Sequence, residues 1–355
     1  MNNSTTGCKI DPEQPWKRIV KITVYAIIMV VALIGNILVC LIVRKTSKAT
    51  RTALHYFLFN MALSDLVIPI VAVNRLLVEL WTGSDSWLVT GLLGSFLCKF
   101  VFFISDVSPM VSILNLLFIA CDRFVAIVLP FQLNLLRSWV CHEIAFSWIL
   151  ACAYFAPYFY AFRLVEGKCV MDWRPVFDHA KTREHYTGAL CVLFILVPFA
   201  LLFIMYSWIT YKLRQSAKYK HNAGCGRHAR RRKSTRRITI LSFLIVLSFA
   251  MCWGAYFALL VTLNFAWRWD ASLLPCYWGT FVFVAQFLAY SNSAVNPAIY
   301  FMLMKDFRSC LKALGYHPVK RKGPLEMERI RDQNIVLRNH QRRHPALSRV
   351  QTTRL

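Results

Sequence analysis

Charged residues are scarce in this sequence, and acidic residues are the scarcest. Of 355 residues, 17% are charged, and 17 aspartates and glutamates stand against 42 lysines and arginines. Hydrophobic residues make up 57% of the chain, and aromatic residues make up 14%. This composition is too apolar for a soluble domain and too aromatic for a disordered chain, so both classes are excluded.

Reactive groupings and internal repeats are also missing from the sequence. It has no nucleotide-binding loop, no cluster with metal-ligand spacing and no nucleophile beside a base, and its nine histidines are scattered. An enzyme is therefore disfavoured. A transporter would show internal repeats and broken spans, and neither is evident. The twelve cysteines are spread along the chain, which excludes a dense disulfide scaffold.

Long apolar runs are what the sequence has in abundance. A helix needs about 20 apolar residues to cross ~30 Å of hydrocarbon. Seven runs reach this length, at about 22–43, 54–80, 97–129, 139–162, 186–211, 238–265 and 277–304. The sequence therefore predicts an all-α fold, a seven-transmembrane helix bundle. The third run is over-long and must tilt or project beyond one membrane face.

Basic residues predict the orientation of this bundle. Lysine and arginine are frequent after runs one and five, whereas residues 81–94 have none and residues 266–274 have only Arg268. The positive-inside rule then places the N-terminus outside the cell and the C-terminus in the cytoplasm of a multi-pass plasma-membrane protein. The net charge of +25 lies mostly in these cytoplasmic segments and suits anionic membrane lipid, so we exclude nucleic acid as a partner.

The polar N-terminus predicts how the first run enters the membrane. Residues 1–21 contain Pro12 and Pro15 and do not resemble a secretory signal peptide, so we expect the first run to act as an uncleaved signal-anchor. Two overlapping glycosylation sequons cover Asn2 and Asn3, in agreement with an extracellular N-terminus over 1–21. Asn3 is the better acceptor because Asn2 lies so close to the chain start.

A polar, proline-containing string lies near the end of the seventh run. Residues 292–300 read NSAVNPAIY, and such groups persist in hydrocarbon where helices, water or an ion satisfy them. Each other run carries one motif, namely Gly35-Asn36, Asn60 to Leu66, Asp122-Arg123, Trp148, Pro198 with Tyr206, and Phe249 with Cys252-Trp253. In this order the motifs resemble rhodopsin-like (class A) G-protein-coupled receptors over about residues 20–315.

The resemblance implies a receptor that signals through heterotrimeric G proteins and is not an enzyme. Lys305 to Arg308 resemble the start of the family's short amphipathic membrane-surface helix, so we assign 22–314 to the receptor domain. Outward movement of the sixth helix, followed by arrestin binding, is what the family implies for activation. A constitutively active, ligand-independent or silent receptor is the main alternative.

The resemblance gives the buried carboxylate of Asp65 a set of polar partners. They are Asn36, Ser112, Asn292, Asn296 and water, often around a sodium ion, a hard cation that prefers oxygen ligands. Collapse of this polar cluster accompanies activation in the family. The residues alone leave a second interpretation open, a protonated and hydrogen-bonded aspartate that braces the bundle. Beyond this sodium ion, we expect no cofactor.

The resemblance also assigns residues to G-protein coupling at the inner ends of the helices. These are Asp122, Arg123, Phe131, Tyr206 and Tyr300. The arginine pairs with its neighbouring acid at rest, a water bridges the two tyrosines, and Phe131 contacts the G protein or faces lipid. Many relatives add a carboxylate at the base of the sixth helix, where this chain has Thr235. We therefore expect the ion pairs that hold the resting state to be weaker and the basal activity to be appreciable.

A packing switch in the middle of the bundle follows from the same resemblance. Ile113, Pro198 and Phe249 match the family's central trio, and Trp253 lies one turn beyond the phenylalanine. The family usually has a kinking proline two residues after this tryptophan, and this chain has Ala255. An alanine keeps the backbone hydrogen bond, so the sixth helix is expected to be straighter and its movement smaller.

Cysteines at the outer face suggest one disulfide or two. The resemblance implies a bridge between Cys98 and Cys169. Cys8 and Cys276 are the other outer cysteines, and we expect a second bridge rather than two free thiols. Cys310, just after the start of the surface helix, is either a palmitoylation site or a plain exposed cysteine.

The ligand is best predicted by exclusion. Opsins have a Schiff-base lysine where this chain has Tyr290, so retinal is excluded. Amine receptors have an aspartate at the position of Ser105; Asp106 is rotated from it by ~100°, which disfavours an amine. The start of the third run and the second outer loop, which is expected to form a hairpin, resemble peptide receptors. We predict a neuropeptide ligand and a pocket lined by Ser105, Asp106, Tyr256, Phe257 and Gln286.

The basic tail over 315–355 is predicted to be disordered until it is bound. Its last residues, Thr353 to Leu355, fit the carboxyl terminus that PDZ domains capture by strand addition. A PDZ protein is therefore a candidate partner, and phosphorylation of Thr353 should block its binding.

Overall fold

A computed structural model of the chain describes residues 14–47, 52–83, 86–129, 139–218, 227–270, 273–305 and 307–309, with side chains except at 216–218 and 227–234. The chain divides into two compact units, Met1–Phe307 and Arg308–Leu355. The helices and strands named below belong to the first unit. In the second, the structure describes Arg308 and Ser309, both helical.

The helices of the described residues form seven groups, one for each predicted run. The first group is α1 (Pro15–Lys45), and the second is α2 (Ala53–Asp65), the π-helical turn η1 (Ile68–Ala72) and α3 (Val73–Thr82). The third is α4 (Gly91–Val128), and the fourth is α6 (Val140–Phe155) with α7 (Tyr158–Ala161). The fifth is α8 (His179–Leu190), η3 (Cys191–Leu196) and α9 (Val197–Lys218). The sixth is α10 (Arg227–Val261) with η4 (Thr262–Ala266), and the seventh is α11 (Trp278–Leu303).

The lengths and apolar surfaces of these helices suit a membrane. Six of the groups in the described part of the chain are long and apolar enough to span one. The seventh, α11, has 26 residues, and its asparagines and serines lower its apolar content. Side chains such as Ile149 (68% exposed) and Phe203 (74% exposed) face outward, where water would make them costly. The all-α, seven-helix membrane bundle predicted from the sequence is confirmed.

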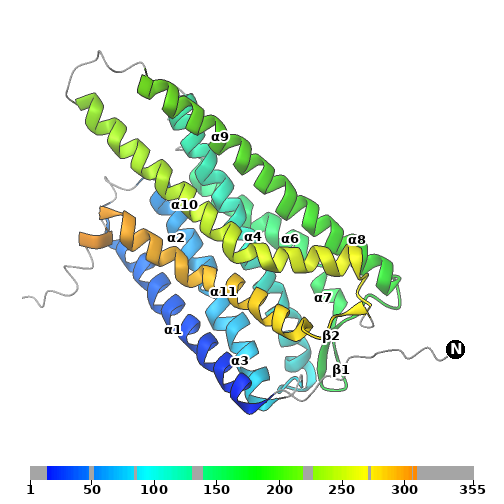
Figure 1. The fold of residues 1–355 in the computed structure, drawn as a ribbon. Coiled ribbons are helices and arrows are strands. Elements are labelled where there is room, and N and C mark those ends of the chain that lie inside the picture. Colours follow the sequence, from blue (N-terminus) through cyan, green and yellow to red (C-terminus); the bar gives the residue numbers. More distant parts are fainter. Residues whose placement is uncertain are drawn as a thin grey trace, which may run out of the picture. The chain divides into compact units, whose positions relative to one another are not determined.

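The third helix forms the middle of the bundle. Figure 1 shows α4 crossing between its neighbours, and it contacts α2, α6, α9 and α10. The seventh helix, α11, packs against α1 and α10. Asn36 in α1 donates a hydrogen bond to the Ser293 carbonyl of α11 at 2.8 Å, so a buried polar contact joins the first and seventh helices.

Prolines lie at two places inside these helices, and a glycine packs against one of them. Pro69 lies in the π-helical turn η1, where its missing N–H removes one helical hydrogen bond. Pro297 lies inside α11, and Gly35 of α1 approaches it so closely that a Cβ on the glycine would lie 2.8 Å from the proline Cβ. Only glycine therefore fits at this crossing of α1 and α11.

This contact predicts that one added methyl group at residue 35 lowers the stability of the protein. Gly35→Ala should destabilise the protein by about 1–3 kcal/mol, because the added Cβ overpacks against Pro297. Gly254→Ala is the matched control, since nothing lies within 4 Å of a Cβ there and alanine is the better helix former. Thermal unfolding of the two variants in nanodiscs measures the difference. Equal melting temperatures would refute the close contact.

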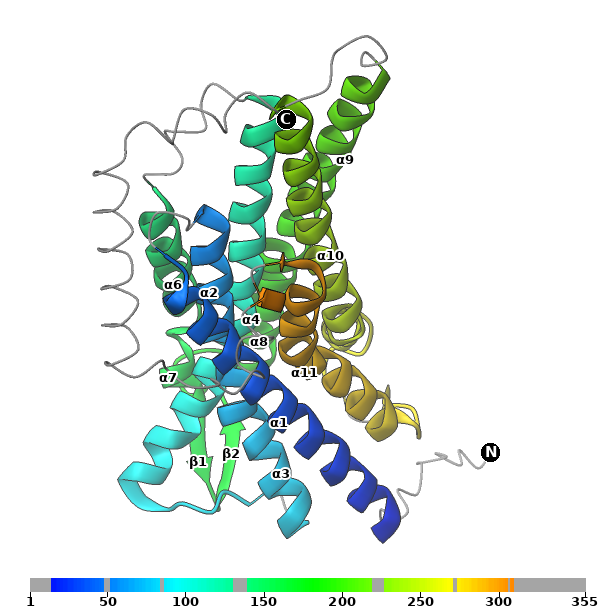
Figure 2. The same ribbon diagram turned by 90° about the vertical axis from the view of Figure 1, so that its left-hand side faces the viewer.

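A short β-hairpin covers one end of the bundle, which we call the hairpin end. Its strands β1 (Phe162–Val165) and β2 (Lys168–Met171) pair antiparallel, with Leu164 opposite Cys169. The Cys98–Cys169 disulfide fastens β2 to the start of α4, with the two Cα atoms 5.6 Å apart. Figure 2 shows the hairpin beside the end of α3. The predicted hairpin and this predicted disulfide are both present.

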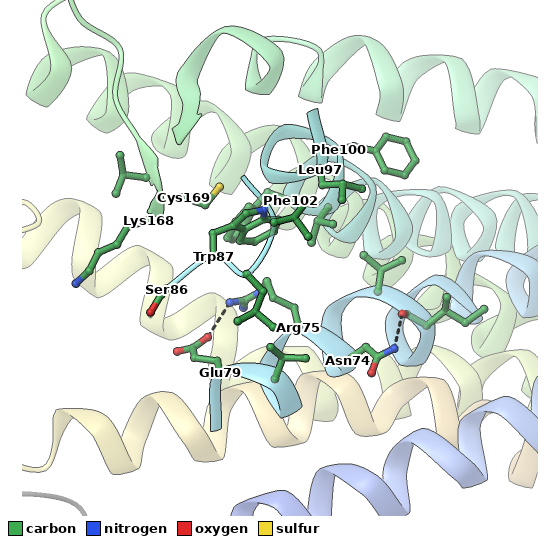
Figure 3. A pocket seen from close by; sticks show the side chains of 17 residues that line it. Asn74, Arg75, Glu79, Ser86, Trp87, Leu97, Phe100, Phe102, Lys168 and Cys169 are labelled. Carbon is green, nitrogen blue, oxygen red and sulfur yellow. Dashed lines mark hydrogen bonds and ion pairs between the residues drawn. The ribbon is translucent and has the colours of Figure 1, made fainter. Parts of the chain in front are cut away.

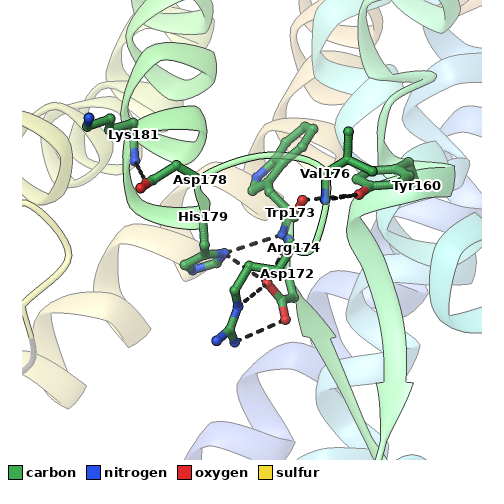
Figure 4. A network of polar contacts seen from close by, with 8 residues as sticks. All are labelled: Tyr160, Asp172, Trp173, Arg174, Val176, Asp178, His179 and Lys181. Carbon is green, nitrogen blue, oxygen red and sulfur yellow. Dashed lines mark hydrogen bonds and ion pairs between the residues drawn. The ribbon is translucent and has the colours of Figure 1, made fainter.

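A polar clasp joins the end of the hairpin to the next helix (Figure 4), because the backbone N–H of Trp173 donates to Nδ1 of His179 in α8 at 3.4 Å. Arg174 donates side-chain hydrogen bonds to both carboxylate oxygens of Asp172, at 3.0 and 3.1 Å, and a backbone hydrogen bond as well. These bonds lower the pKa of Asp172 to about 2. Because the folded-state pKa is depressed, the clasp stabilises the loop above the ordinary aspartate pKa and is lost only as the pH falls towards 2. Asp178 then caps α8 by accepting from the Lys181 N–H at 2.9 Å.

Candidate functional site

A cavity of about 360 Å³ lies inside the bundle, and we call it the central cavity. It opens among α4, α10 and α11, and it is within the size range of pockets that enclose ligand groups. All five residues predicted to line a ligand pocket lie on its wall, namely Ser105, Asp106, Tyr256, Phe257 and Gln286. The structure therefore brings these residues together, and their contact with a ligand stays a prediction.

The two neighbouring polar residues of α4 have different partners. Ser105 donates its hydroxyl to the Val101 carbonyl at 2.6 Å, one turn earlier in the same helix. Asp106 instead accepts a hydrogen bond from the Tyr158 hydroxyl at 2.8 Å, across to α7. The carboxylate thus has a fixed position in the cavity wall, and it retains acceptor capacity for a ligand.

Two arginines on the wall were not singled out from the sequence. Arg75 comes from α3; its guanidinium donates to Glu79 at 2.9 Å and lies 5.0 Å from the ring centre of Phe102. Arg183 comes from α8 and lies 4.7 Å from the ring centre of Trp269, and its buried Nε has no hydrogen-bond partner among the described residues. Arg75 could have been found from the sequence, because it is a charged residue inside the second apolar run.

The floor of the central cavity consists of the predicted packing residues. Ile113 and Trp253 both line the cavity. The Trp253 ring stacks on Phe249 with the ring centres 6.0 Å apart, and Phe249 is fully buried. Pro198 is buried in the adjacent helix α9. The α-helix of α10 continues without interruption past Gly254 and Ala255, in keeping with the absence of a proline there. A ligand in the cavity would therefore rest directly on the residues that join α4 to α10.

Below this floor lies the polar cluster around Asp65. The Asp65 carboxylate accepts hydrogen bonds from Asn296 Nδ2 at 2.9 Å and from Ser112 Oγ at 3.3 Å. Asn36 and Asn292 are also buried, and Asn36 donates to backbone carbonyls of α1 and α11 rather than to Asp65. The amide oxygens of Asn36, Asn292 and Asn296 are buried and have no hydrogen-bond partner within the described residues.

Buried amides extend this polar region toward the fourth helix. The Trp148 indole donates to Asn60 Oδ1 at 2.8 Å, and Asn60 donates in turn to Asn115 Oδ1 at 3.0 Å. Asn60 and Trp148 were recognised as motif residues, and the structure shows that they contact one another. Asn115 completes the chain of bonds and had no sequence signal of its own. These bonds fix α2, α4 and α6 relative to one another.

The end of the bundle opposite the hairpin carries the predicted coupling residues. Arg123 donates two hydrogen bonds to the Asp122 carboxylate, the Nε contact being 3.0 Å long. Tyr206 and Tyr300 are buried near this end, and no hydrogen bond joins their hydroxyls in the part of the chain described. The Tyr300 hydroxyl instead lies 4.0 Å from the Met61 sulfur. The arginine is thus held by its neighbour, as the resemblance implied for a resting state.

Several predicted residues lie outside the described part of the chain. They are Asn2, Asn3, Cys8, Phe131, Cys310, Thr353 and Leu355. Cys276 is disulfide-bonded. Its predicted partner, Cys8, lies outside the described residues, so the second bridge stays a prediction. Most of the predicted surface helix is also outside them, although residues 305 and 307–309 are helical.

These observations define a class of protein before any comparison is made. A lipid-facing helical bundle encloses a cavity at one end and holds an Asp–Arg pair at the other, with packed aromatic rings and a buried carboxylate between them. This is the architecture of a transmembrane receptor. The chain belongs to the rhodopsin family of seven-transmembrane receptors, whose family model matches residues 35–300.

The relatives reported below are members of this family that are named for peptides. The human substance-K receptor is 30% identical over 312 residues, which cover 86% of this chain and 75% of the relative. A QRFP-like peptide receptor of Branchiostoma floridae is 27% identical over 328 residues, 88% of this chain and 82% of the relative. The RYamide receptor of Drosophila melanogaster is 29% identical over 327 residues, which cover 87% of this chain and 67% of the relative. The sequence-based assignment to this receptor family is confirmed.

Proposed function

We propose that this protein is a plasma-membrane receptor that an extracellular peptide activates and that signals through heterotrimeric G proteins. The similarity to receptors named for peptides supports this function. The observation that carries it is the central cavity, because the cavity lies directly on the Phe249–Trp253 contact of α10. The hairpin end then faces outward and the Asp122–Arg123 end faces the cytoplasm, as the positive-inside rule requires.

The charges on the cavity wall favour a peptide over a simple amine. Asp106 offers one carboxylate, while Arg75 and Arg183 offer two guanidinium groups. An amine would be bound by the carboxylate alone. A peptide carries both a cationic group and carbonyl or carboxylate oxygens, and guanidinium groups bind such oxygens well. The wall therefore matches a peptide end that has both kinds of group.

The packing of the floor suggests how such a ligand acts. A group that presses on Trp253 displaces a ring already stacked on Phe249, and both belong to α10. Movement of α10 away from α4 would uncover Arg123 for the G protein. The change is allosteric in the strict sense, because the ligand and the G protein both favour the same arrangement of helices.

A G-protein activation panel tests this function. Cells that express the receptor are exposed to substance K, RYamides and QRFP-like peptides, with an amine panel in parallel. We expect at least one peptide to raise G-protein activation above both the untreated receptor and vector-transfected cells. Activation by an amine alone would overturn the peptide assignment. Output that is high and unaffected by every ligand would favour the constitutively active alternative.

The polar cluster fits a sodium ion. A hard cation needs oxygen ligands, and the cluster offers the Asp65 carboxylate, the Ser112 hydroxyl and buried amide oxygens that lack other partners. No group of three or more histidine, cysteine or acidic side chains occurs in the residues described, so a transition-metal site is not suggested there. We therefore assign Asp65, Ser112, Asn36, Asn292 and Asn296 to holding sodium in the resting receptor.

Sodium binding predicts a cation-specific effect on stability. At a tenfold excess over its Kd, sodium should stabilise the resting receptor by about 1.4 kcal/mol. The melting temperature should rise when NaCl replaces choline chloride at constant ionic strength, and Asp65→Asn should abolish this rise. Asp106→Asn is the control, because it removes a carboxylate outside the polar cluster. A sodium response that survives in Asp65→Asn would exclude this site.

Arrestin, membrane lipid and a PDZ protein remain proposed partners on the cytoplasmic side. The PDZ proposal rests on Thr353 and Leu355 and on the need of such domains for a free carboxylate and a threonine hydroxyl. A synthetic tail peptide should bind a PDZ domain, and its Thr353-phosphorylated form should not. Equal binding of the two forms would rule out a phosphorylation switch.

A further inference from the structure

A second cavity, which we call the side cavity, lies at the hairpin end between α3, the start of α4 and β2 (Figure 3). Its volume of about 690 Å³ exceeds that of the central cavity, and it is separate from the pocket predicted from the sequence. Its walls are held in place. The Cys98–Cys169 disulfide fixes β2, and the backbone N–H of Trp87 donates to the Gly167 carbonyl at 2.6 Å.

The side cavity is amphipathic. In Figure 3, Glu79, Ser86 and Lys168 lie toward one end, and Leu97 and Phe100 lie toward the other. Apolar side chains at its margin, such as Ile70 and Leu88, are more than half exposed and would face hydrocarbon or the membrane interface. A ligand with a polar head and an apolar chain would match both ends and would enter from the lipid.

The polar groups of the wall favour an anionic head. Among the described residues of the wall, Arg75 and Lys168 carry positive charges and Glu79 carries a negative one. The Trp87 indole Nε1 is buried and has no hydrogen-bond partner in the described residues, so the wall holds a donor that a ligand acceptor would satisfy. A carboxylate accepts from an indole N–H and from a guanidinium fork at once.

Two side chains connect this cavity to the central one. Arg75 and Phe102 line both cavities, and the guanidinium lies over the phenylalanine ring. A carboxylate that binds Arg75 from the side cavity would compete with Glu79 and would change the position of the guanidinium on the central wall. Such coupling acts equally in both directions, from lipid to peptide and from peptide to lipid.

We propose that the side cavity is a binding site for a single-chain carboxylate amphiphile of the fatty-acid type, which modulates the central cavity through Arg75. Binding at the side cavity does not depend on the identity of the activating peptide. It can therefore be measured directly, and its failure would leave the proposed receptor function untouched.

Photo-crosslinking tests the proposal on the full receptor in phosphatidylcholine nanodiscs. The probe is palmitate with a diazirine in its chain, and the labelled peptides are mapped by mass spectrometry. We expect saturable labelling within residues 70–79 and 86–102, competed by palmitate but not by hexadecanol, which lacks the carboxylate. Non-saturable labelling spread over the lipid-facing helices, or equal competition by hexadecanol, would overturn the site.

Variants assign the binding to the head-group contacts. Arg75→Gln should weaken palmitate competition about tenfold, the usual effect of losing a hydrogen bond to a charged group. Arg214→Gln is the matched control, because this exposed arginine borders a different apolar groove between α9 and α10. Trp87→Phe keeps the ring and removes the donor, so it provides a second test if Arg75→Gln does not fold. Unchanged affinity in whichever of these two variants folds would refute the proposal.

Discussion

Asp106→Asn should lower the potency of a cationic peptide that activates this receptor by about 30-fold or more, because losing one partner of a buried, hydrogen-bonded charge pair costs 2–5 kcal/mol. The asparagine is nearly isosteric, and its side-chain oxygen can still accept from the Tyr158 hydroxyl. The local packing should therefore persist while the negative charge is lost. The readout is the concentration–response curve of G-protein activation for each active peptide of the panel.

The neighbouring residue supplies the control for this experiment. Ser105 also lines the central cavity, but its hydroxyl donates to the Val101 carbonyl of its own helix. Ser105→Ala should thus leave potency within a few-fold of the wild type. If Asp106→Asn keeps full potency for every active cationic peptide, the carboxylate is not a ligand contact. If both variants lose potency equally, the effect is one of packing rather than of charge.

Thr235→Glu should lower ligand-free signalling about five- to tenfold, since an added ion pair worth about 1–1.4 kcal/mol favours the resting arrangement by that factor. Residue 235 is the position at the base of the sixth helix where the family resemblance implies a carboxylate in many relatives. Arg123 is bonded only to Asp122 among the described residues, so it has donors left for a second carboxylate. The measurement is second-messenger output without ligand, normalised to surface expression.

Thr235→Gln separates charge from side-chain length in this test. It carries an amide in place of the carboxylate and should reduce basal output little. Wild-type output equal to that of vector-transfected cells would contradict the expectation of basal activity. An equal reduction by glutamate and glutamine would show that the new side chain acts by bulk.

The helices were predictable because hydrocarbon imposes a simple requirement. Each span must satisfy its own backbone, so every apolar run of sufficient length becomes a helix. The runs expected at 97–129 and 277–304 match α4 and α11 to within a few residues, apart from one extra turn or more at the start of α4. The π-helical turns η1, η3 and η4 were not predicted, because apolar composition does not distinguish π-helical from α-helical turns.

Site residues could be predicted from the sequence only where a family motif fixes their position in the chain. Asp65 was assigned in this way, and the structure gives its carboxylate hydrogen bonds from Asn296 and Ser112. The five predicted pocket residues line one cavity, and their contact with a ligand stays a prediction. Arg75 and Arg183 were missed because their roles depend on contacts across helices, with Glu79 and Phe102 for the first and Trp269 for the second. The side cavity is built from loop and helix ends that no local pattern identifies.

The central claim is that α10 moves away from the bundle when the receptor couples to a G protein. Spin labels at Tyr56→Cys in α2 and Arg236→Cys in α10 report this movement, since both positions are exposed. Cys141→Ser removes the exposed free thiol of the described residues, and Cys225→Ser with Cys310→Ser removes two cysteines that lie outside them. Pulsed electron resonance measures the distance between the labels with and without nucleotide-free G protein. No agonist is needed, because the G protein itself favours the active arrangement. We predict a shift to longer distances when the G protein binds; an unchanged distribution in a receptor shown to have bound it would contradict the account.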